Sequence, residues 1–276
     1  MAITTYSDIS FVLSGGTSNI NPNAALGGEP SSYPIVDSMV NNLFNDVTPS
    51  QSQEGYEDYR CFYVFNDGPT TVYEVKIWVA SEYAGGASVQ LGIDYKNELQ
   101  RITIGNVGIT GGSFTLSYNG TSFIVNYDPD IGVWATNFQT AINNLLALND
   151  VQIIVQYSSD STLFDVSFTG RDGKRWHPAL AIVSNNLIPE TTIGLSILQV
   201  GSPINTSAVE IGAETNPPGG VVFYETTETS PIYVPRLDPE DELPIWVKRT
   251  TLENTESIAE DGFTFRFSAE SLAPLS

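Results

Sequence analysis

Apolar and polar residues alternate in two runs of the segment DYRCFYVFNDGPTTVYEVKIWV (58–79), on either side of an Asn66-Asp67-Gly68-Pro69 turn. A period of two is typical of a half-buried β-strand, and the Asp-Gly pair favours a reversal of the chain. The stretch from Asp58 to Val79 therefore predicts a hairpin or a sharp strand reversal. Runs of the same character return only at 244–251 (PIWVKRTT) and 261–269 (DGFTFRFSA). We expect both ends of the chain to close one β-sandwich.

Further strands follow from the same alternation. One is predicted at 88–95 (SVQLGIDY), and after residue 201 five runs separated by Pro or Asp turns are predicted as strands. In the last of them Phe263, Phe265 and Phe267 alternate with polar residues, which indicates an aromatic row that faces a core. The five runs are 207–214, 219–225, 231–237, 244–250 and 262–268.

The pattern changes in the middle of the chain. A hairpin is predicted at 111–127, with Asn119-Gly120 at its turn. The segment 131–150 shows helical spacing, and strands are predicted at 151–157, 163–170 and 192–200. One helix packed on an antiparallel sheet is an α+β arrangement. The apolar face of the helix consists of Trp134, Phe138, Ile142, Leu145 and Leu146.

These patterns predict a mainly β protein of three parts. An Ig-like β-sandwich is formed discontinuously by residues 58–101 and 202–276, and an α+β domain is inserted at 102–201. Its entry, GNVGITGG (105–112), is interpreted as a flexible junction. Residues 1–57 form an irregular N-terminal arm that buries little, because much of it is Gly, Asn, Ser and Pro. The arm is expected to hold one strand at 8–13, a short helix at 37–47 and an acidic loop at 48–59. It is expected to lie on its own domain or on a neighbouring subunit, and the alternative is a partly mobile tail.

Composition narrows the classes of partner. The 276 residues include 32 acidic and 11 basic ones, for a net charge of −21. So acidic a surface argues against nucleic acid and anionic membranes as partners. It fits solubility without a specific partner, which is the favoured interpretation, and also cation binding or docking onto a basic neighbour. No run reaches the length of a membrane span, and the N-terminus lacks the pattern of a signal peptide. Cys61 is the only cysteine and is expected to be a buried, inert thiol, so neither a disulfide within the chain nor a cysteine zinc site is expected.

Two stretches carry a resemblance to a known class of proteins. The block YRCFYVFND…VYEVKIWV, followed much later by VPRLDPEDELPIWVKRT and DGFTFRF, resembles a family of bacteriophage virion proteins, as does the opening FVLSGGTSNINPNAALGGEPSS. The central block is similar to a small module of phage and bacterial surface proteins. It shows GGSFTLSYNG, then a helix of the ATNFQTAINNLLAL type, then VSFTGRDGKRWHPALAIVSN. The resemblance implies a structural protein of the tail, the baseplate or its fibres, located in the virion, and it implies no catalytic motif.

Enzyme signals are weak. Asp128 and Asp130 could serve as a pair of glycosidase carboxylates or bind calcium, but a turn that caps the following helix is the favoured interpretation. The acidic run 238–242 is interpreted as an exposed turn rather than a cation site. Because His177 is the only histidine, a Ser-His-Asp triad would have to include it. We expect no catalytic residue, no metal and no cofactor.

One basic spot stands out on this acidic chain. It consists of Arg171, Lys174, Arg175, Trp176 and His177. Three interpretations stay open: a docking site for an acidic neighbour, an aromatic and cationic contact for a glycan, or a solvated turn with Trp176 packed inward. Two other cations, Arg60 and Arg249, lie in predicted sandwich strands and are expected to pair with carboxylates.

The leading functional hypothesis is a non-enzymatic structural component of a phage particle, which would assemble symmetrically with copies of itself and with other virion proteins. The alternatives are an adhesin that binds a glycan on the host surface and a capsid decoration protein. For the adhesin, Trp134 and Trp176 would have to be exposed stacking platforms.

Overall fold

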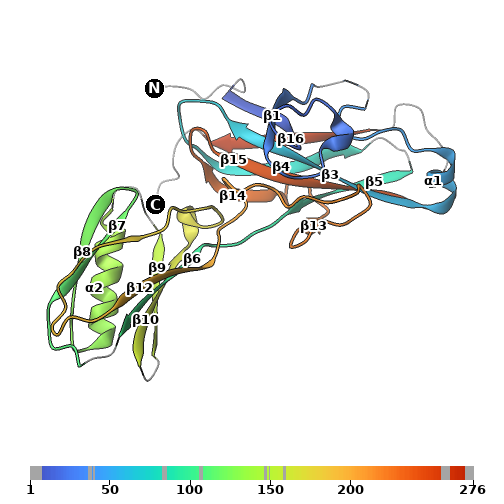
Figure 1. The fold of residues 1–276 in the computed structure, drawn as a ribbon. Coiled ribbons are helices and arrows are strands. Elements are labelled where there is room, and N and C mark those ends of the chain that lie inside the picture. Colours follow the sequence, from blue (N-terminus) through green and yellow to red (C-terminus); the bar gives the residue numbers. More distant parts are fainter. Residues whose placement is uncertain are drawn as a thin grey trace. The chain divides into compact units, whose positions relative to one another are not determined.

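The computed structural model describes residues 8–36, 39, 41–82, 86–105, 108–145, 148, 150–157, 160–255 and 262–270. It shows a mainly β protein built from several antiparallel sheets (Figure 1). The chain divides into two compact units. Unit 1 contains Met1–Asp94 and Pro203–Ser276, and unit 2 contains Tyr95–Ser202.

The larger sheet of unit 1 combines strands from both ends of the chain. It has six strands in the order β13-β5-β15-β3-β1-β2, and every neighbouring pair is antiparallel. β15 lies between β3 and β5, with Trp246 opposite Cys61 in β3. The strands are β1 (Ile9–Ser14), β2 (Pro30–Pro34), β3 (Tyr56–Asn66), β5 (Ala87–Ile93), β13 (Val222–Tyr224) and β15 (Glu242–Thr251).

The second sheet of unit 1 has the order β14-β4-β16, with β14 (Ile232–Leu237), β4 (Val72–Glu82) and β16 (Phe263–Glu270). Aromatic rings join the two sheets: the ring centroids of Phe62 and Phe265 are 5.0 Å apart. The partners predicted for the 58–79 stretch are therefore confirmed, because β15 pairs with β3 and β16 pairs with β4. The aromatic row of β16 faces this core as expected.

The chain reverses after Asn66, but β3 and β4 do not form a hairpin. They belong to different sheets, so the hairpin alternative is wrong and the sharp reversal is right. The buried Asn66 side chain fixes the corner, since its amide nitrogen donates to the carbonyls of Thr70 at 3.0 Å and Leu237 at 3.1 Å. As a result of this reversal, β3 pairs with β15, and β4 pairs with β14 and β16, all from the C-terminal part of the chain.

The first 57 residues contribute to the core, contrary to expectation. β1 pairs with β3, β2 pairs with β1, and Ala25, Leu43 and Phe44 are buried. A helix, α1 (Pro49–Glu54), stands where a loop was expected, and a capping box formed by Thr48 and Gln51 begins it. The helix expected at 37–47 is absent from its described part, which is turn and bend at 41–44, and positions 37, 38 and 40 lie outside the described residues.

A second expected element of unit 1 is also missing. The run 207–214 forms no strand. It has one β-bridge, between Ala208 and Gly28, and single backbone hydrogen bonds from Ile211 to Leu26 and from Tyr59 to Glu214. The alternation of apolar and polar residues in this run is weak. Because Glu210 and Gly212 are exposed, the run has little apolar surface to bury against a sheet. The other strands predicted after residue 201 are present.

The described part of unit 2 contains two sheets and one α-helix, α2 (Ile131–Asn143). One sheet has the order β12-β6-β10-β9 and the other β11-β7-β8. β7 and β8 form the predicted hairpin, with Asn119 and Gly120 at positive φ in its turn. The strands are β6 (Leu99–Gly105), β7 (Ser113–Tyr118), β8 (Thr121–Asn126), β9 (Val151–Tyr157), β10 (Ser161–Phe168), β11 (Ala181–Asn185) and β12 (Ile193–Gln199).

α2 packs on the sheets through the face that its spacing predicts. Trp134, Phe138, Ile142 and Leu145 are buried, and Leu146 lies outside the described residues. The helix ends at Asn143 rather than near residue 150. Asn residues at its C-terminal end have low helix propensity, and the chain turns there into β9.

Two details of unit 2 differ from the sequence pattern. The predicted boundary at residue 102 falls inside β6, which begins at Leu99 and is an inner strand of its sheet. β11 was not predicted, although it pairs with β7 in register from Ala181 opposite Ser117. The segment KNELQ (96–100) has no clear alternation, so local pattern does not reveal that β6 begins at Leu99.

Candidate functional site

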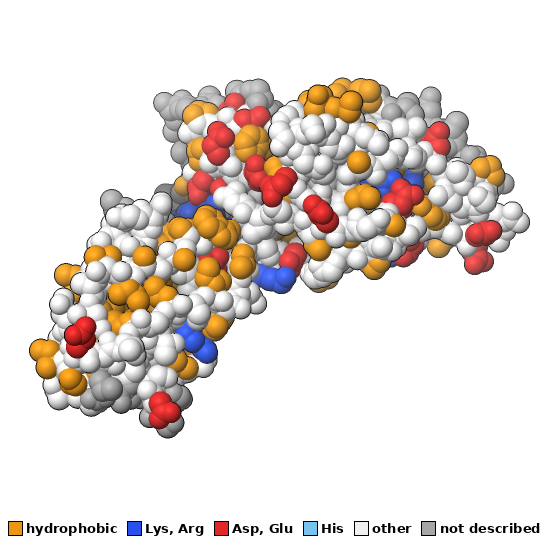
Figure 2. All heavy atoms as spheres, viewed as in Figure 1, with side chains coloured by type: hydrophobic (Ala, Val, Ile, Leu, Met, Phe, Trp, Pro, Cys, Tyr) orange, Lys and Arg blue, Asp and Glu red, His pale blue; other side chains and the backbone are white. Residues whose placement is uncertain are grey.

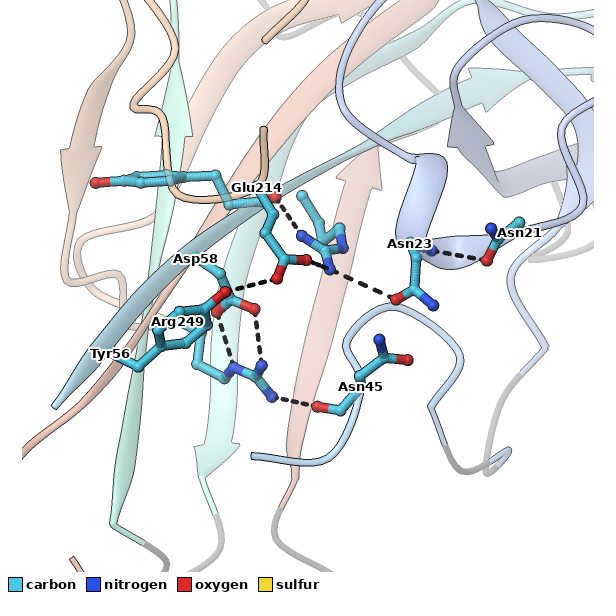
Figure 3. Close-up of polar contacts among 9 residues, drawn as sticks. Asn21, Asn23, Asn45, Tyr56, Asp58, Glu214 and Arg249 are labelled. Carbon is cyan, nitrogen blue, oxygen red and sulfur yellow. Dashed lines mark hydrogen bonds and ion pairs between the residues drawn. The ribbon is translucent and has the colours of Figure 1, made fainter. Parts of the chain in front are cut away.

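A polar cluster of unit 1 includes a buried ion pair on neighbouring strands (Figure 3). Asp58 of β3 stands opposite Arg249 of β15. The guanidinium donates two bonds to the carboxylate, from Nε to Oδ1 at 2.9 Å and from Nη2 to Oδ2 at 2.7 Å. Its third bond goes from Nη1 to the carbonyl of Asn45 at 2.7 Å. Such a fork fixes both side chains and ties the N-terminal segment to the sheet.

A second ion pair lies beside the first. The side chain of Arg60 is fully buried and binds the carboxylate of Glu214, which also accepts a bond of 2.5 Å from the Tyr56 hydroxyl (Figure 3). Arg60 Nη1 donates to the carbonyl of Tyr59 at 2.9 Å. The two pairs confirm the expectation that Arg60 and Arg249 bind carboxylates.

The electrostatics of this cluster follow from burial and pairing. Burial raises the pKa of Asp58, although the bonds from Arg249 oppose the rise. Burial by itself would also raise the pKa of Glu214. The hydrogen bonds from Tyr56 and Arg60 outweigh burial, so the pKa of Glu214 is lowered. Burial, together with the bond to Glu214, raises the pKa of Tyr56 to about 12.

An aromatic ring from the N-terminal segment completes the cluster. The guanidinium carbons of Arg249 and Arg60 lie 4.6 Å and 5.5 Å from the ring centroid of Phe44. Every carboxylate of the cluster is thus paired with a cation, and each cation also contacts Phe44. The arrangement holds three distant segments of unit 1 together and offers no free acid or base for chemistry. Sequence spacing could not reveal it, because Phe44, Asp58, Glu214 and Arg249 are far apart in the chain.

The five residues of the predicted basic spot do not form one exposed face. His177 is buried: its ring stacks on Phe168 with 3.9 Å between centroids. Its Nδ1 lies 2.8 Å from the Tyr118 hydroxyl and its Nε2 lies 2.6 Å from the carbonyl of Asp172. Arg175 is also buried. The only histidine is therefore a structural part of the core of unit 2.

The other three residues are nearer the surface. Trp176 is 46% exposed, while Arg171 and Lys174 are half-buried. Lys174 Nζ lies 4.2 Å from the ring centroid of Tyr95, and burial lowers its pKa. Of the candidate glycan contacts, Trp176 is thus the one whose apolar ring is open to a ligand.

The carboxylates considered as catalytic or cation-binding groups have structural partners. Asp130 caps α2, since its Oδ1 accepts bonds from the N–H groups of Gly132 at 2.8 Å and Val133 at 3.3 Å. Asp128 in turn accepts the Asp130 N–H at 2.8 Å. In the acidic run 238–242, Asp241 is buried and accepts a bond of 2.6 Å from the Asn205 side chain. That run is therefore only partly an exposed turn.

Metal and thiol chemistry find little support in the described part of the chain. Among those residues no group of three or more His, Cys, Asp or Glu side chains is placed to hold a metal ion. Cys61 is fully buried, and burial raises the pKa of its thiol, as expected of an inert cysteine.

Unit 2 contains an open groove that was not among the features predicted from the sequence. It has a volume of about 420 Å³ and lies between β8 and α2. None of its lining side chains is charged. They are Phe123, Ile124 and Asn126 of β8, Asn137, Thr140 and Ala141 of α2, and Asn144. A signal was present in the sequence: the polar face of a helix on so acidic a chain contains only Asn, Gln and Thr.

Comparison of the chain with protein-family models and with curated proteins finds no match. Neither helix in the described residues has the length and apolar character needed to cross a membrane.

Proposed function

We propose that the protein is a non-enzymatic structural component of a bacteriophage particle, acting in the tail, in the baseplate or in fibre attachment. In this proposal unit 1 is an Ig-like β-sandwich closed by both ends of the chain, and unit 2 is an inserted α+β domain. The strand pattern that resembles virion proteins lies in β3, β4, β15 and β16.

One observation carries the proposal: the candidate catalytic side chains in the described part of the chain are engaged within the fold. Asp128 and Asp130 cap a helix start, His177 is enclosed, and the carboxylates of the unit 1 cluster are paired with arginines. In this proposal the protein acts on other molecules through contacts made by its surface. Unit 1 has 24 acidic and six basic residues, a net charge of −18, which suits a basic neighbour in an assembly.

Immunogold labelling can test whether the protein is part of the phage particle. Antibodies raised against the purified chain are applied to phage particles from the producing host and located by immunogold electron microscopy. The proposal expects labels at regular positions on the tail or baseplate. Labels on the head would instead favour a capsid decoration protein, and purified particles without the chain by mass spectrometry would refute a structural role.

A glycan-binding adhesin is the second candidate, and the exposed indole of Trp176 favours it. Trp134 does not, because it is 2% exposed and packs in the core of unit 2. A glycan array with the wild-type chain and with Trp176→Ala separates the two candidates. An adhesin would lose binding in the variant, whereas a purely structural component would show no glycan signal with either chain.

A further inference from the structure

Two edge strands of unit 2 lie beside α2. β8 ends the three-stranded sheet, and β9 ends the four-stranded sheet. An edge strand presents backbone N–H and C=O groups that can pair with another strand. The two edges differ in how the helix covers these groups.

The β9 edge is closed by a side chain. The amide of Gln139 donates from Nε2 to the carbonyl of Val151 and accepts the N–H of Ile153 at Oε1, at 2.7 Å. A neighbouring strand would need these same two groups for its ladder. β9 is therefore protected against pairing with another chain.

The β8 edge is open. In a two-residue hairpin the backbone groups of Thr121, Phe123 and Val125 face β7, so those of Ser122, Ile124 and Asn126 face outward. Within the described residues the one bond to that edge runs from the Asn137 amide to the carbonyl of Asn126, at a marginal 3.5 Å. The groove of about 420 Å³ lies directly beside this edge.

The usual protection of an edge strand is missing as well. Charges, proline or bulges normally prevent pairing, but β8 reads TSFIVN and its register with β7 is regular. α2 also lacks charged residues, and Figure 2 shows few charged side chains over the part of unit 2 labelled β7, β8 and α2 in Figure 1. A wide uncharged surface is typical of the centre of an interface.

The distribution of charge indicates which molecule can approach. Unit 2 has eight acidic and five basic residues, a net charge of −3, against −18 for unit 1. Two copies of so acidic a chain repel each other least where charge is absent. The run 102–127, which includes β8, contains no Lys, Arg, Asp or Glu.

We propose that β8 pairs antiparallel with β8 of a second copy, about a two-fold axis at Ile124. In this register Ile124 faces its own counterpart, and Ser122 faces Asn126 of the second copy. An apolar pair is thus flanked by two hydrogen-bonding pairs, so the strand is self-complementary as a two-fold contact requires. The two three-stranded sheets become one, and the uncharged faces of Thr140 and Asn144 on α2 meet the second copy.

The inference deepens the proposed function, because repeated assembly needs a self-complementary surface. It is tested on the purified chain, without particles, so the two proposals fail separately. Sedimentation equilibrium compares wild type with Ile124→Lys and with the matched control Ile154→Lys. Both isoleucines are exposed on edge strands, at 57% and 48%, but the edge of Ile154 is closed by Gln139.

The expected result is a wild-type dimer that Ile154→Lys keeps and Ile124→Lys weakens at least about tenfold, since two lysines would stand directly opposite each other. If circular dichroism shows Ile124→Lys to be unfolded, Thr140→Lys on the exposed face of α2 replaces it. A monomeric wild type, or a dimer that Ile124→Lys or its replacement leaves unchanged, overturns the proposal. A monomeric wild type would favour pairing of the β8 edge with a strand of a different protein.

A crosslink tests the register. Residues opposite each other in a hydrogen-bonded antiparallel pair have Cα atoms about 5.5 Å apart, within the range of a disulfide. Ile124→Cys is therefore expected to form a covalent dimer on mild oxidation, visible on a non-reducing gel, while Ile154→Cys stays monomeric. The buried Cys61 does not compete. Failure of Ile124→Cys to crosslink in a chain that dimerises would exclude this register.

Discussion

Individual residues in unit 1 show how an acidic chain uses its few cations. Asp58 and Arg249 are both buried and bound to each other in a fork, so each partner depends on the other being present. A buried pair contributes little net stability compared with apolar residues, yet removal of one partner leaves an uncompensated charge in the interior. The cluster therefore ties segments together rather than adding a large stability of its own.

Arg249→Met is expected to lower the free energy of unfolding of unit 1 by about 3–5 kcal/mol, because it leaves Asp58 buried without a partner. Lys248→Met is the matched control, since this neighbouring residue pairs with the exposed Glu57 and should cost at most about 1 kcal/mol. Urea denaturation measures both. Equal effects of the two substitutions would contradict the interpretation, and Asp58→Leu combined with Arg249→Met should recover much of the loss.

The pKa of Glu214 gives a prediction in pH. A carboxyl whose pKa is lower in the folded than in the unfolded chain adds stability above its ordinary pKa of about 4.3, and this stability disappears as pH falls through the folded value. Glu214→Gln should therefore destabilise unit 1 at pH 7, and this effect should be smaller at about pH 3, below the ordinary carboxyl pKa of about 4.3. Unfolding free energies measured at both pH values test it. A difference between variant and wild type that is constant with pH would show that the carboxylate charge is unimportant.

At the scale of elements, α2 illustrates what local sequence can and cannot specify. Its N-terminus is set by Asp130, which precedes Ile131 and accepts two helix N–H groups. Its C-terminus and its stability depend on packing, because Asn and β-branched residues reduce helix propensity. The buried ring of Phe138 contacts Phe114, Phe123 and Phe164 from three different strands.

Asp130→Ala is expected to lower the stability of unit 2 by about 1 kcal/mol through loss of the helix cap, and Asp130→Ser should preserve most of it. Hydrogen exchange of the α2 backbone amides, followed by mass spectrometry, reports on this region. Loss of a hydrolytic activity on substitution of Asp130, with unchanged stability, would instead support a catalytic carboxylate.

At the scale of the whole molecule, unit 1 cannot close until the end of the chain is present. β15 fills the position between β3 and β5, and β16 pairs with β4. Unit 2 consists of one continuous segment with its own core. The two units are thus expected to differ in their dependence on the C-terminus.

Truncation after Leu237 removes β15 and β16 and is expected to unfold unit 1 while unit 2 stays folded. Hydrogen exchange followed by mass spectrometry would then show protection only in 95–202. The isolated fragment 95–202 is the companion experiment and should give a folded circular dichroism spectrum with a cooperative melt. An unfolded fragment would show that unit 2 is not an independent domain.

Part of this fold could be predicted because it follows from short-range patterns. Alternation located β3, β4, β15 and β16, helical spacing located α2, and Asn119-Gly120 located a hairpin turn. Other features could not. The N-terminal segment is rich in polar residues, so it was not predicted to enter a core. Leu43 and Phe44 are nevertheless buried, because β3 provides a surface against which they pack. A strand such as β11 has little pattern of its own and exists because β7 offers an edge.

The sequence by itself determined the positions of β3, β4, β15, β16 and α2, that Cys61 would be buried, and that Arg60 and Arg249 would need carboxylates, since these depend on polarity and spacing. Only the tertiary structure decided that β3 and β4 enter different sheets, that Asp58 and Glu214 are the carboxylates, and that the predicted basic spot divides between core and surface. It also decided that Gln139 closes one edge of unit 2 while β8 stays open. Each of these depends on contacts between residues far apart in the chain, and local patterns do not encode them.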